Sequence, residues 1–126
     1  MSSDPTTVEL SILRAFSPLD GPKKQNLRAL ARKTGLRELP QGRVLVKEGD
    51  TEKRTYYLAS GVVELLSNGR VIATIRGGTT DARHPIAPIL PRHCTARVAS
   101  DKIDYLSIDS DLLDVLITWD QTGIYE

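Results

Sequence analysis

The first third of the chain carries apolar residues at helical spacing. A first helix is predicted from the apolar positions Val8, Leu10, Ile12, Leu13 and Phe16. It should end near residues 17–18, because proline cannot continue a helix. Residues 20–22, Asp-Gly-Pro, predict the start of a second helix, with Gly35 as its C-cap. We therefore expect a helical lead-in over residues 6–35.

Between residues 36 and 108 the pattern changes to short apolar runs separated by turns. The predicted strands cover residues 43–47, 55–59, 62–66, 70–75, 95–99 and 103–108. Asn68-Gly69 between two apolar runs predicts a tight hairpin. Asp109 should cap a final helix over residues 109–119, with Trp119 packing that helix against the strands. The pattern predicts a mainly β fold with flanking helices, in which an antiparallel β-roll or barrel forms the body.

Length and charge narrow the class of protein. A chain of 126 residues suits one domain over residues 1–126 with a real core. The formal net charge of +1 and the lack of a basic block argue against direct nucleic-acid binding. No apolar run approaches the roughly 20 residues that a membrane-spanning helix needs, and the first residues do not resemble a signal peptide. We expect a cytoplasmic protein that does not bind membranes.

The segment over residues 77–95 is irregular and is the main candidate site. It contains three prolines at intervals of three and both histidines of the chain. An irregular segment inside a β pattern is typical of a loop where ligands bind. Arg83 and Arg92 lie in it. If their side chains point inward they form an anion pocket, and if they point outward they are ordinary solvated charges.

Several turn motifs occur in an order that resembles cyclic nucleotide-binding domains. They are Leu39-Pro40-Gln41-Gly42, Glu48-Gly49-Asp50, Tyr57-Leu58, Ser60-Gly61-Val62-Val63-Glu64 and Gly69. The resemblance covers roughly residues 10–118 and implies a jelly-roll barrel with a helical lead-in and a closing helix. It also implies a phosphate-binding cassette, a segment that reads Gly-Glu, a short apolar helix, Pro-Arg and then threonine.

The cassette, taken here as residues 81–95, departs from that pattern. Pro91, Arg92 and Thr95 match its end, but Ala82 stands at the glycine position and Arg83 at the position of the ribose-binding glutamate. A hydrogen bond to a carboxylate contributes about 1.5–3 kcal/mol, so its loss weakens binding about tenfold to a hundredfold. The resemblance therefore implies weak binding of cAMP and cGMP.

The three prolines also change the expected phosphate-binding cassette. Pro85, Pro88 and Pro91 lack the backbone N–H groups that such a segment offers to a phosphate, and Pro88 would interrupt a helix begun at Pro85. The resemblance leaves five candidate ligand-binding residues: Ala82, Arg83, His84, Arg92 and Thr95.

Metal binding and catalysis have little support in the sequence. His84 and His93 lie on either side of the cassette, but a metal site needs three or four convergent ligands. Cys94, the single cysteine, excludes an internal disulfide and is expected to be a small buried strand residue. No nucleophile elbow or paired carboxylates occur, so we expect neither a metal site nor an enzyme.

Two classes of function remain open. In the first, the chain is a non-enzymatic sensor that uses Arg83 and Arg92 to bind a nucleotide with a second anionic group, such as a cyclic dinucleotide. In the second, it is a ligand-free barrel that docks on a partner protein or forms a homodimer, with Arg83 in a surface salt bridge. Residues 120–126 are too few for a lid and an output domain. The chain is therefore expected to be a fragment, or to signal through a separate partner.

The two classes share one expectation about Arg92. Pro91 fixes the chain before it, and Thr95 lies three residues beyond it, so the guanidinium should lie inside the barrel. A buried cation without an anionic ligand needs another partner. The carboxylates of Asp81 and Glu64 are the expected candidates.

Overall fold

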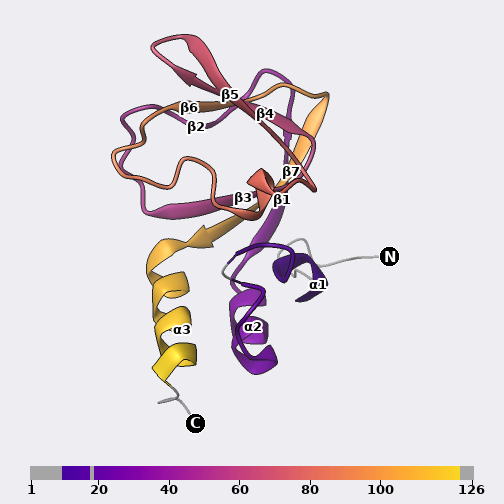
Figure 1. Ribbon diagram of the computed structural model, residues 1–126, viewed down its shortest axis with the longest axis vertical. Coiled ribbons are helices and arrows are strands. Elements are labelled where there is room, and N and C mark those ends of the chain that lie inside the picture. Colours follow the sequence, from indigo (N-terminus) through magenta and orange to yellow (C-terminus); the bar gives the residue numbers. More distant parts are fainter. Residues whose placement is uncertain (1–9, 18, 123–126) are drawn as a thin grey trace.

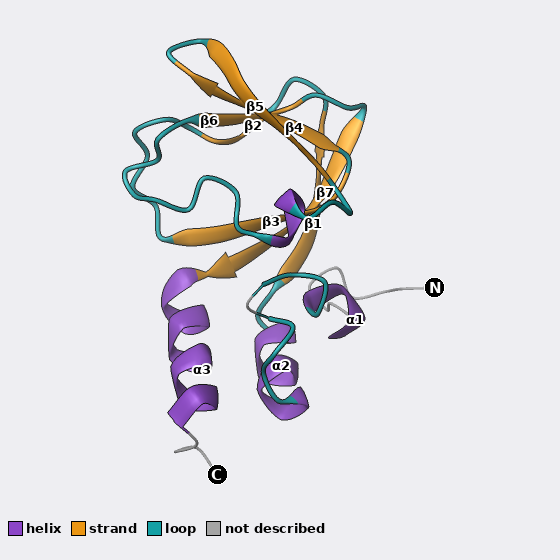
Figure 2. Ribbon diagram, in the orientation of Figure 1, coloured by secondary structure: helices purple, strands orange, loops and turns teal. Residues whose placement is uncertain are grey.

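The computed structural model is a roll of two facing antiparallel sheets with helices packed beneath it (Figure 1). It describes residues 10–17 and 19–122. The helices are α1 (Leu10–Leu13), α2 (Lys24–Ala31), the short 3₁₀ helix η1 (Asp81–Arg83) and α3 (Ser110–Thr122). The strands are β1 (Gly35–Pro40), β2 (Val44–Val46), β3 (Arg54–Ser60), β4 (Val62–Ser67), β5 (Arg70–Arg76), β6 (Thr95–Val98) and β7 (Lys102–Asp109). The prediction of a mainly β fold with flanking helices is confirmed, as Figure 2 shows.

One sheet has the strand order β1-β7-β3 and the other has the order β2-β6-β4-β5. Strands β4 and β5 form the predicted hairpin, in which Ser67 pairs with Arg70. Asn68 and Gly69 between them have φ angles of 54° and 79°. Positive φ at both turn residues suits the right-handed twist of the two strands, and this is why Asn-Gly occurs here.

Strand β3 separates two hydrophobic cores, because successive side chains of a strand point to opposite faces. Tyr57 points toward the helices, where it packs with residues such as Leu13, Leu27 and Leu106. Leu58 points into the roll, toward the opposite sheet. The sheet β1-β7-β3 is therefore covered on both faces.

The cassette supplies part of the core inside the roll. Ile86 is buried there against the strands, in the same cluster as Leu58, Val63 and Val98. Its backbone N–H donates to the carbonyl of Tyr56 at 2.8 Å. Residues 81–95 thus form a wall of the roll, and in Figure 2 they begin as the short helix η1 and continue as a long loop to β6.

The helical lead-in differs in detail from the prediction. Helix α1 is a single turn, and Val8 and Pro18 lie outside the described residues. Helix α2 ends at Ala31, so the assignment of Gly35 as its C-cap was wrong. The Thr34 hydroxyl donates to the carbonyl of Leu30 at 2.7 Å and satisfies an orphan acceptor at this helix end. Gly35 instead begins β1, where it pairs with Ser107.

The predicted cap of the last helix is confirmed. The Asp109 side chain accepts hydrogen bonds from the backbone N–H groups of Asp111 and Leu112, at 2.9 and 3.2 Å. Helix α3 continues to Thr122, which is three residues beyond the predicted end. The side chain of Trp119 is not among those described. Within the described ranges, no helix has both the length and the apolar character needed to cross a membrane.

Tyr57 connects β3 to the helical lead-in. Its ring lies 4.9 Å from that of Phe16, and its hydroxyl donates to the carbonyl of Ser17 at 2.9 Å. Burial raises the pKa of Tyr57 from 10.0 to about 12.

This pKa shift predicts a loss of stability at high pH. The folded state holds the Tyr57 proton more tightly than the unfolded state, so the stabilisation is complete below pH 10 and is lost as the pH rises toward 12. The loss should be on the order of 2 kcal/mol. Urea unfolding at several pH values measures it. Tyr57→Phe should cost about 1 kcal/mol at neutral pH and show a weaker alkaline decline. The same alkaline decline in the wild type and in Tyr57→Phe would show that Tyr57 does not cause the loss of stability.

Candidate functional site

The cassette begins with the helix η1. The backbone N–H groups at this helix already donate hydrogen bonds within the protein. The N–H groups of Ala82 and Arg83 donate to the carbonyls of Thr79 and Thr80, both at 3.1 Å. The N–H of His84 donates to the carbonyl of Asp81 at 3.3 Å. Residues 84–94, all of them described, contain no helix. The segment therefore lacks the helix N-terminus with free amides that holds a phosphate.

Arg92 is the buried charge of the cassette. It is 3% exposed, so the expectation that it lies inside the roll is confirmed. Its guanidinium donates to the carbonyl of Ala87 at 2.8 Å, to that of Glu52 at 3.1 Å and to that of Arg54 at 2.6 Å. These bonds connect the cassette loop to the start of β3.

The partners of Arg92 differ from those expected. Neither Asp81 nor Glu64 contacts it, because Asp81 is exposed and Glu64 pairs with Arg97 at 3.1 Å. Three carbonyl oxygens satisfy the cation instead, since each has a partial negative charge and a lone pair directed at an N–H group. The Nε atom of Arg92 is buried and has no hydrogen-bond partner among the described residues.

Tyr56 covers the Arg92 guanidinium from one side. The Cζ atom of Arg92 lies 5.7 Å from the centre of the Tyr56 ring, which is within the range of a cation–π contact. Burial raises the pKa of Tyr56, and the charge of Glu52 and a 3.2 Å hydrogen bond to its carboxylate raise it further. The phenol therefore stays neutral at physiological pH.

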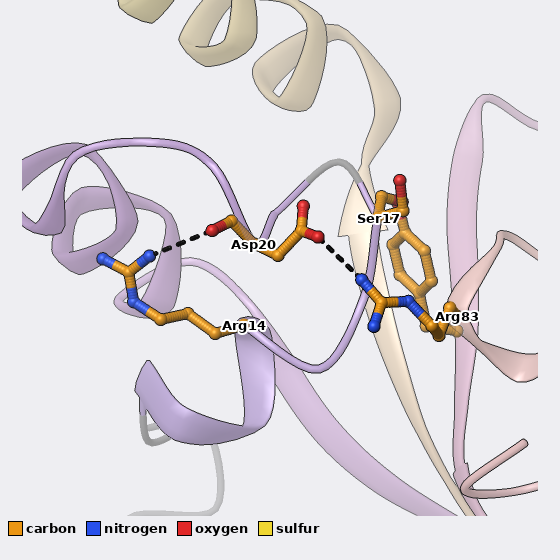
Figure 3. A network of polar contacts seen from close by, with 5 residues as sticks. Arg14, Ser17, Asp20 and Arg83 are labelled. Atoms are coloured by element: carbon orange, nitrogen blue, oxygen red, sulfur yellow. Dashed lines mark hydrogen bonds and ion pairs between the residues drawn. The ribbon is translucent and has the colours of Figure 1, made fainter. Parts of the chain in front are cut away.

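Arg83 points away from Arg92 and toward the helical lead-in. Its guanidinium lies 2.7 Å from the Asp20 carboxylate, and both side chains are nearly half exposed, at 46% and 45% (Figure 3). The backbone carbonyl of Arg83 accepts a hydrogen bond from the N–H of Ser17 at 2.7 Å. The residue at the ribose-binding position thus pairs with a carboxylate of its own chain.

The other candidate residues do not form a cluster of free polar groups. Ala82 is buried, His84 is exposed, and the Thr95 hydroxyl accepts a hydrogen bond from the N–H of Glu48 at 3.0 Å. Ala82 and Arg83 lie on η1, and His84 follows it directly. Arg92 and Thr95 lie at the far end of the cassette, with different partners.

Two cavities lie beside the cassette. One of about 400 Å³ lies between the segment that follows α1, β3 and η1, and Phe16, Leu58, Ala82 and Arg83 contribute to its wall. A second of about 340 Å³ lies between Pro85, Pro88 and helix α3. Arg92 lines neither of these two cavities, so the two arginines do not face a common space in this conformation.

Sequence reasoning missed the groups that engage the two arginines. Asp20 was interpreted as part of a helix start, and it lies 63 residues before Arg83. The acceptors of Arg92 are backbone carbonyls of Glu52 and Arg54, which leave no trace in a pattern of side chains. The apolar character of Ile86 was the one signal that could have shown that the cassette packs into the roll.

The thiol of Cys94 and the imidazoles of His84 and His93 differ in their exposure. Cys94 is buried, and burial together with the charge of Glu48 raises the pKa of its thiol, which keeps it protonated. His84 and His93 are exposed. In the described part of the chain, no three His, Cys, Asp or Glu side chains are grouped so as to hold a metal ion.

The contacts of Arg92 predict a large effect on stability. Arg92→Lys should lower the free energy of unfolding by about 1–3 kcal/mol, because a single ammonium cannot reach carbonyls on both the cassette and β3. Urea unfolding followed by circular dichroism measures this. Arg70→Lys, at an exposed position of β5, is the control and should change stability by less than about 0.5 kcal/mol. Equal effects of the two substitutions would show that the Arg92 contacts do not stabilise the fold.

Comparison with solved structures identifies the fold. The regulatory subunit of a cAMP-independent protein kinase A from Trypanosoma brucei, in a mutant form bound to cAMP, superposes with a TM-score of 0.72 at 18% identity, over 94% of this chain and 44% of that chain. The corresponding subunit from Trypanosoma cruzi, bound to guanosine, gives 0.71 at 15% identity, over 94% and 42%. A Geobacter metallireducens protein named for cyclic nucleotide binding gives 0.71 at 19% identity, over 92% and 86%.

The sequence comparisons add no closer relative. No family model matches the chain, and no curated protein is significantly similar to it in sequence. The chain spans less than half the length of the two trypanosome subunits. At this level of identity the likeness concerns the architecture alone. The predicted jelly roll is confirmed: this chain has the fold of the cyclic nucleotide-binding domains.

Proposed function

We propose that this chain is a single, non-enzymatic regulatory module that is insensitive to physiological cAMP and cGMP, because its cassette is closed by contacts within the protein. One observation carries the proposal. Both arginines that the resemblance assigns to ligand binding are engaged by protein groups, Arg92 by three carbonyls and Arg83 by Asp20.

A cyclic mononucleotide would have to replace these contacts. The Arg92 guanidinium gives up charged hydrogen bonds of about 1.5–3 kcal/mol each if it turns to a phosphate, so the net gain from the phosphate is small. A ribose hydroxyl would meet no carboxylate, since Arg83 supplies only donors. The amides of Ala82 and Arg83 are also occupied. Each of these three features weakens the binding of cAMP and cGMP.

The output of such a module is a protein contact. With its ligand groups engaged internally, the roll is a preformed surface that docks on a partner protein or on a second copy of the chain in the cytoplasm. Two of the structurally similar proteins are regulatory subunits of protein kinases A that are described as cAMP-independent, and this supports a regulatory role without a cAMP signal.

A second candidate is a sensor of a nucleotide with a second anionic group, such as a cyclic dinucleotide. The Arg92 Nε favours it, because this buried N–H lacks an acceptor that a ligand could supply. The guanosine bound to the Trypanosoma cruzi subunit further supports a nucleoside ligand in this fold. Binding of this kind requires Arg83 to leave Asp20.

Calorimetry tests the first proposal. Wild-type protein should show no saturable binding of cAMP or cGMP at low-micromolar concentration. Arg83→Glu combined with Ala82→Gly should strengthen binding about tenfold or more, since it restores the ribose acceptor and the glycine. Arg70→Glu, on the exposed strand β5, makes the same charge change away from the cassette and should have no effect. Low-micromolar binding by the wild-type protein would contradict the proposal.

Thermal shifts separate the two candidates. A cyclic dinucleotide that binds the folded state raises the unfolding midpoint, while cAMP and cGMP leave it unchanged. Arg92→Ala should abolish that rise and Arg83→Ala should reduce it, because a buried contact to an anion costs more to lose than an exposed one. A flat response to all of these nucleotides at millimolar concentration supports the docking module.

A further inference from the structure

Three polar contacts join the helical lead-in to the cassette and to β3, and a fourth lies within the lead-in itself. The Asp20 carboxylate pairs with the Arg83 guanidinium at 2.7 Å, and the Asp20 carbonyl accepts from Arg14 at 3.3 Å (Figure 3). The Ser17 N–H donates to the Arg83 carbonyl at 2.7 Å, and the Ser17 carbonyl accepts from the buried Tyr57 hydroxyl at 2.9 Å. Ser17 is thus bonded to Arg83 of η1 on one side and to Tyr57 of β3 on the other, and Asp20 is paired with Arg83.

Arg83, which takes part in two of these contacts, also lines the cavity of about 400 Å³. Ala15 and Phe16 line this cavity from the lead-in, Ala82 lines it from the cassette, and Thr80 lines it from just before the cassette. A group that enters this cavity therefore meets both segments. Among the described residues that line it, Arg83 has the only charged side chain, and its partner Asp20 is not part of the lining.

We propose that the Asp20–Arg83 pair is an anion-sensitive latch. Asp20 holds the lead-in on the cassette without any ligand, and an anionic group that enters the cavity competes with Asp20 for the Arg83 guanidinium and releases the lead-in. This latch rests on the proposed function, because it starts from a cassette that is closed without a ligand. It deepens that function by stating how an anion opens the contact between the cassette and the lead-in.

The exposure of the pair suits a reversible latch. Ion pairs that are nearly half exposed are screened by salt and stabilise a structure only modestly. A competing anion can therefore open the latch without unfolding the roll. The Arg92 contacts are buried and remain in place, so only the lead-in and η1 respond.

A second ion pair provides a matched control. Lys102 and Glu38 lie 2.8 Å apart and are 57% and 65% exposed, so the pair is similar in length and is also open to solvent. These residues belong to β7 and β1, which are already joined by the backbone ladder of one sheet. Loss of the Lys102–Glu38 pair should leave the lead-in unchanged. Asp20 and Arg83, by contrast, connect two segments that share no sheet.

Amide hydrogen exchange at Ser17, followed by NMR, tests the latch. Asp20→Asn should accelerate exchange of this amide about two- to fivefold, as expected for the loss of an exposed ion pair, with little change in the unfolding midpoint. Glu38→Gln should leave it unchanged. The charge swap Asp20→Arg with Arg83→Asp should restore protection. Unchanged exchange in Asp20→Asn, or no rescue by the swap, would overturn the latch.

Inorganic pyrophosphate tests the competition. At matched ionic strength, pyrophosphate should accelerate Ser17 exchange in the wild type and in Glu38→Gln more than sodium chloride does. In Arg83→Ala the exchange should already be fast and should not respond. Equal effects of pyrophosphate and sodium chloride on the wild type would overturn the proposal that an anion opens the latch. No cyclic nucleotide is present in either experiment, so these results are independent of the calorimetry that tests the proposed function.

Discussion

The buried guanidinium of Arg92 is the constraint on which the cassette and the roll depend. Its bonds to the carbonyls of Ala87, Glu52 and Arg54 hold a proline-rich loop, which has no secondary structure of its own between residues 84 and 94, against β3. A charge in this position is costly without partners, so the loop and the strand must stay together for the cation to remain satisfied. Ile86, buried between the same two parts, adds apolar contact to this closure.

Strand β3 connects the cassette to the rest of the molecule. On one face it meets the cassette and the interior of the roll, and on the other it presents Tyr57 to the helices. Tyr57 in turn holds the connection after α1 through the carbonyl of Ser17. The cassette, the strand and the helical lead-in are therefore in continuous contact through packing and hydrogen bonds.

The replacement of a carboxylate by Arg83 changes more than the affinity for a ribose. A glutamate at this position would repel Asp20, whereas arginine attracts it and pairs with it at 2.7 Å. Arginine at this position therefore adds a contact between the cassette and the lead-in that a glutamate would not make.

The sequence by itself determined the architecture, because strands, hairpins and caps are set by local patterns. Alternating apolar residues, the Asn68-Gly69 turn and the Asp109 cap led to six of the strands and to the last helix, and Pro91-Arg92 led to the correct burial of the arginine. The first strand, β1 (Gly35–Pro40), was not predicted, because its pairing with β7 joins segments far apart in the sequence. Only the tertiary structure decided what the arginines contact. The Arg92 acceptors are backbone carbonyls, which every residue possesses, and Asp20 meets Arg83 across 63 residues of sequence. Such contacts depend on how the chain folds back on itself, and no local pattern encodes them.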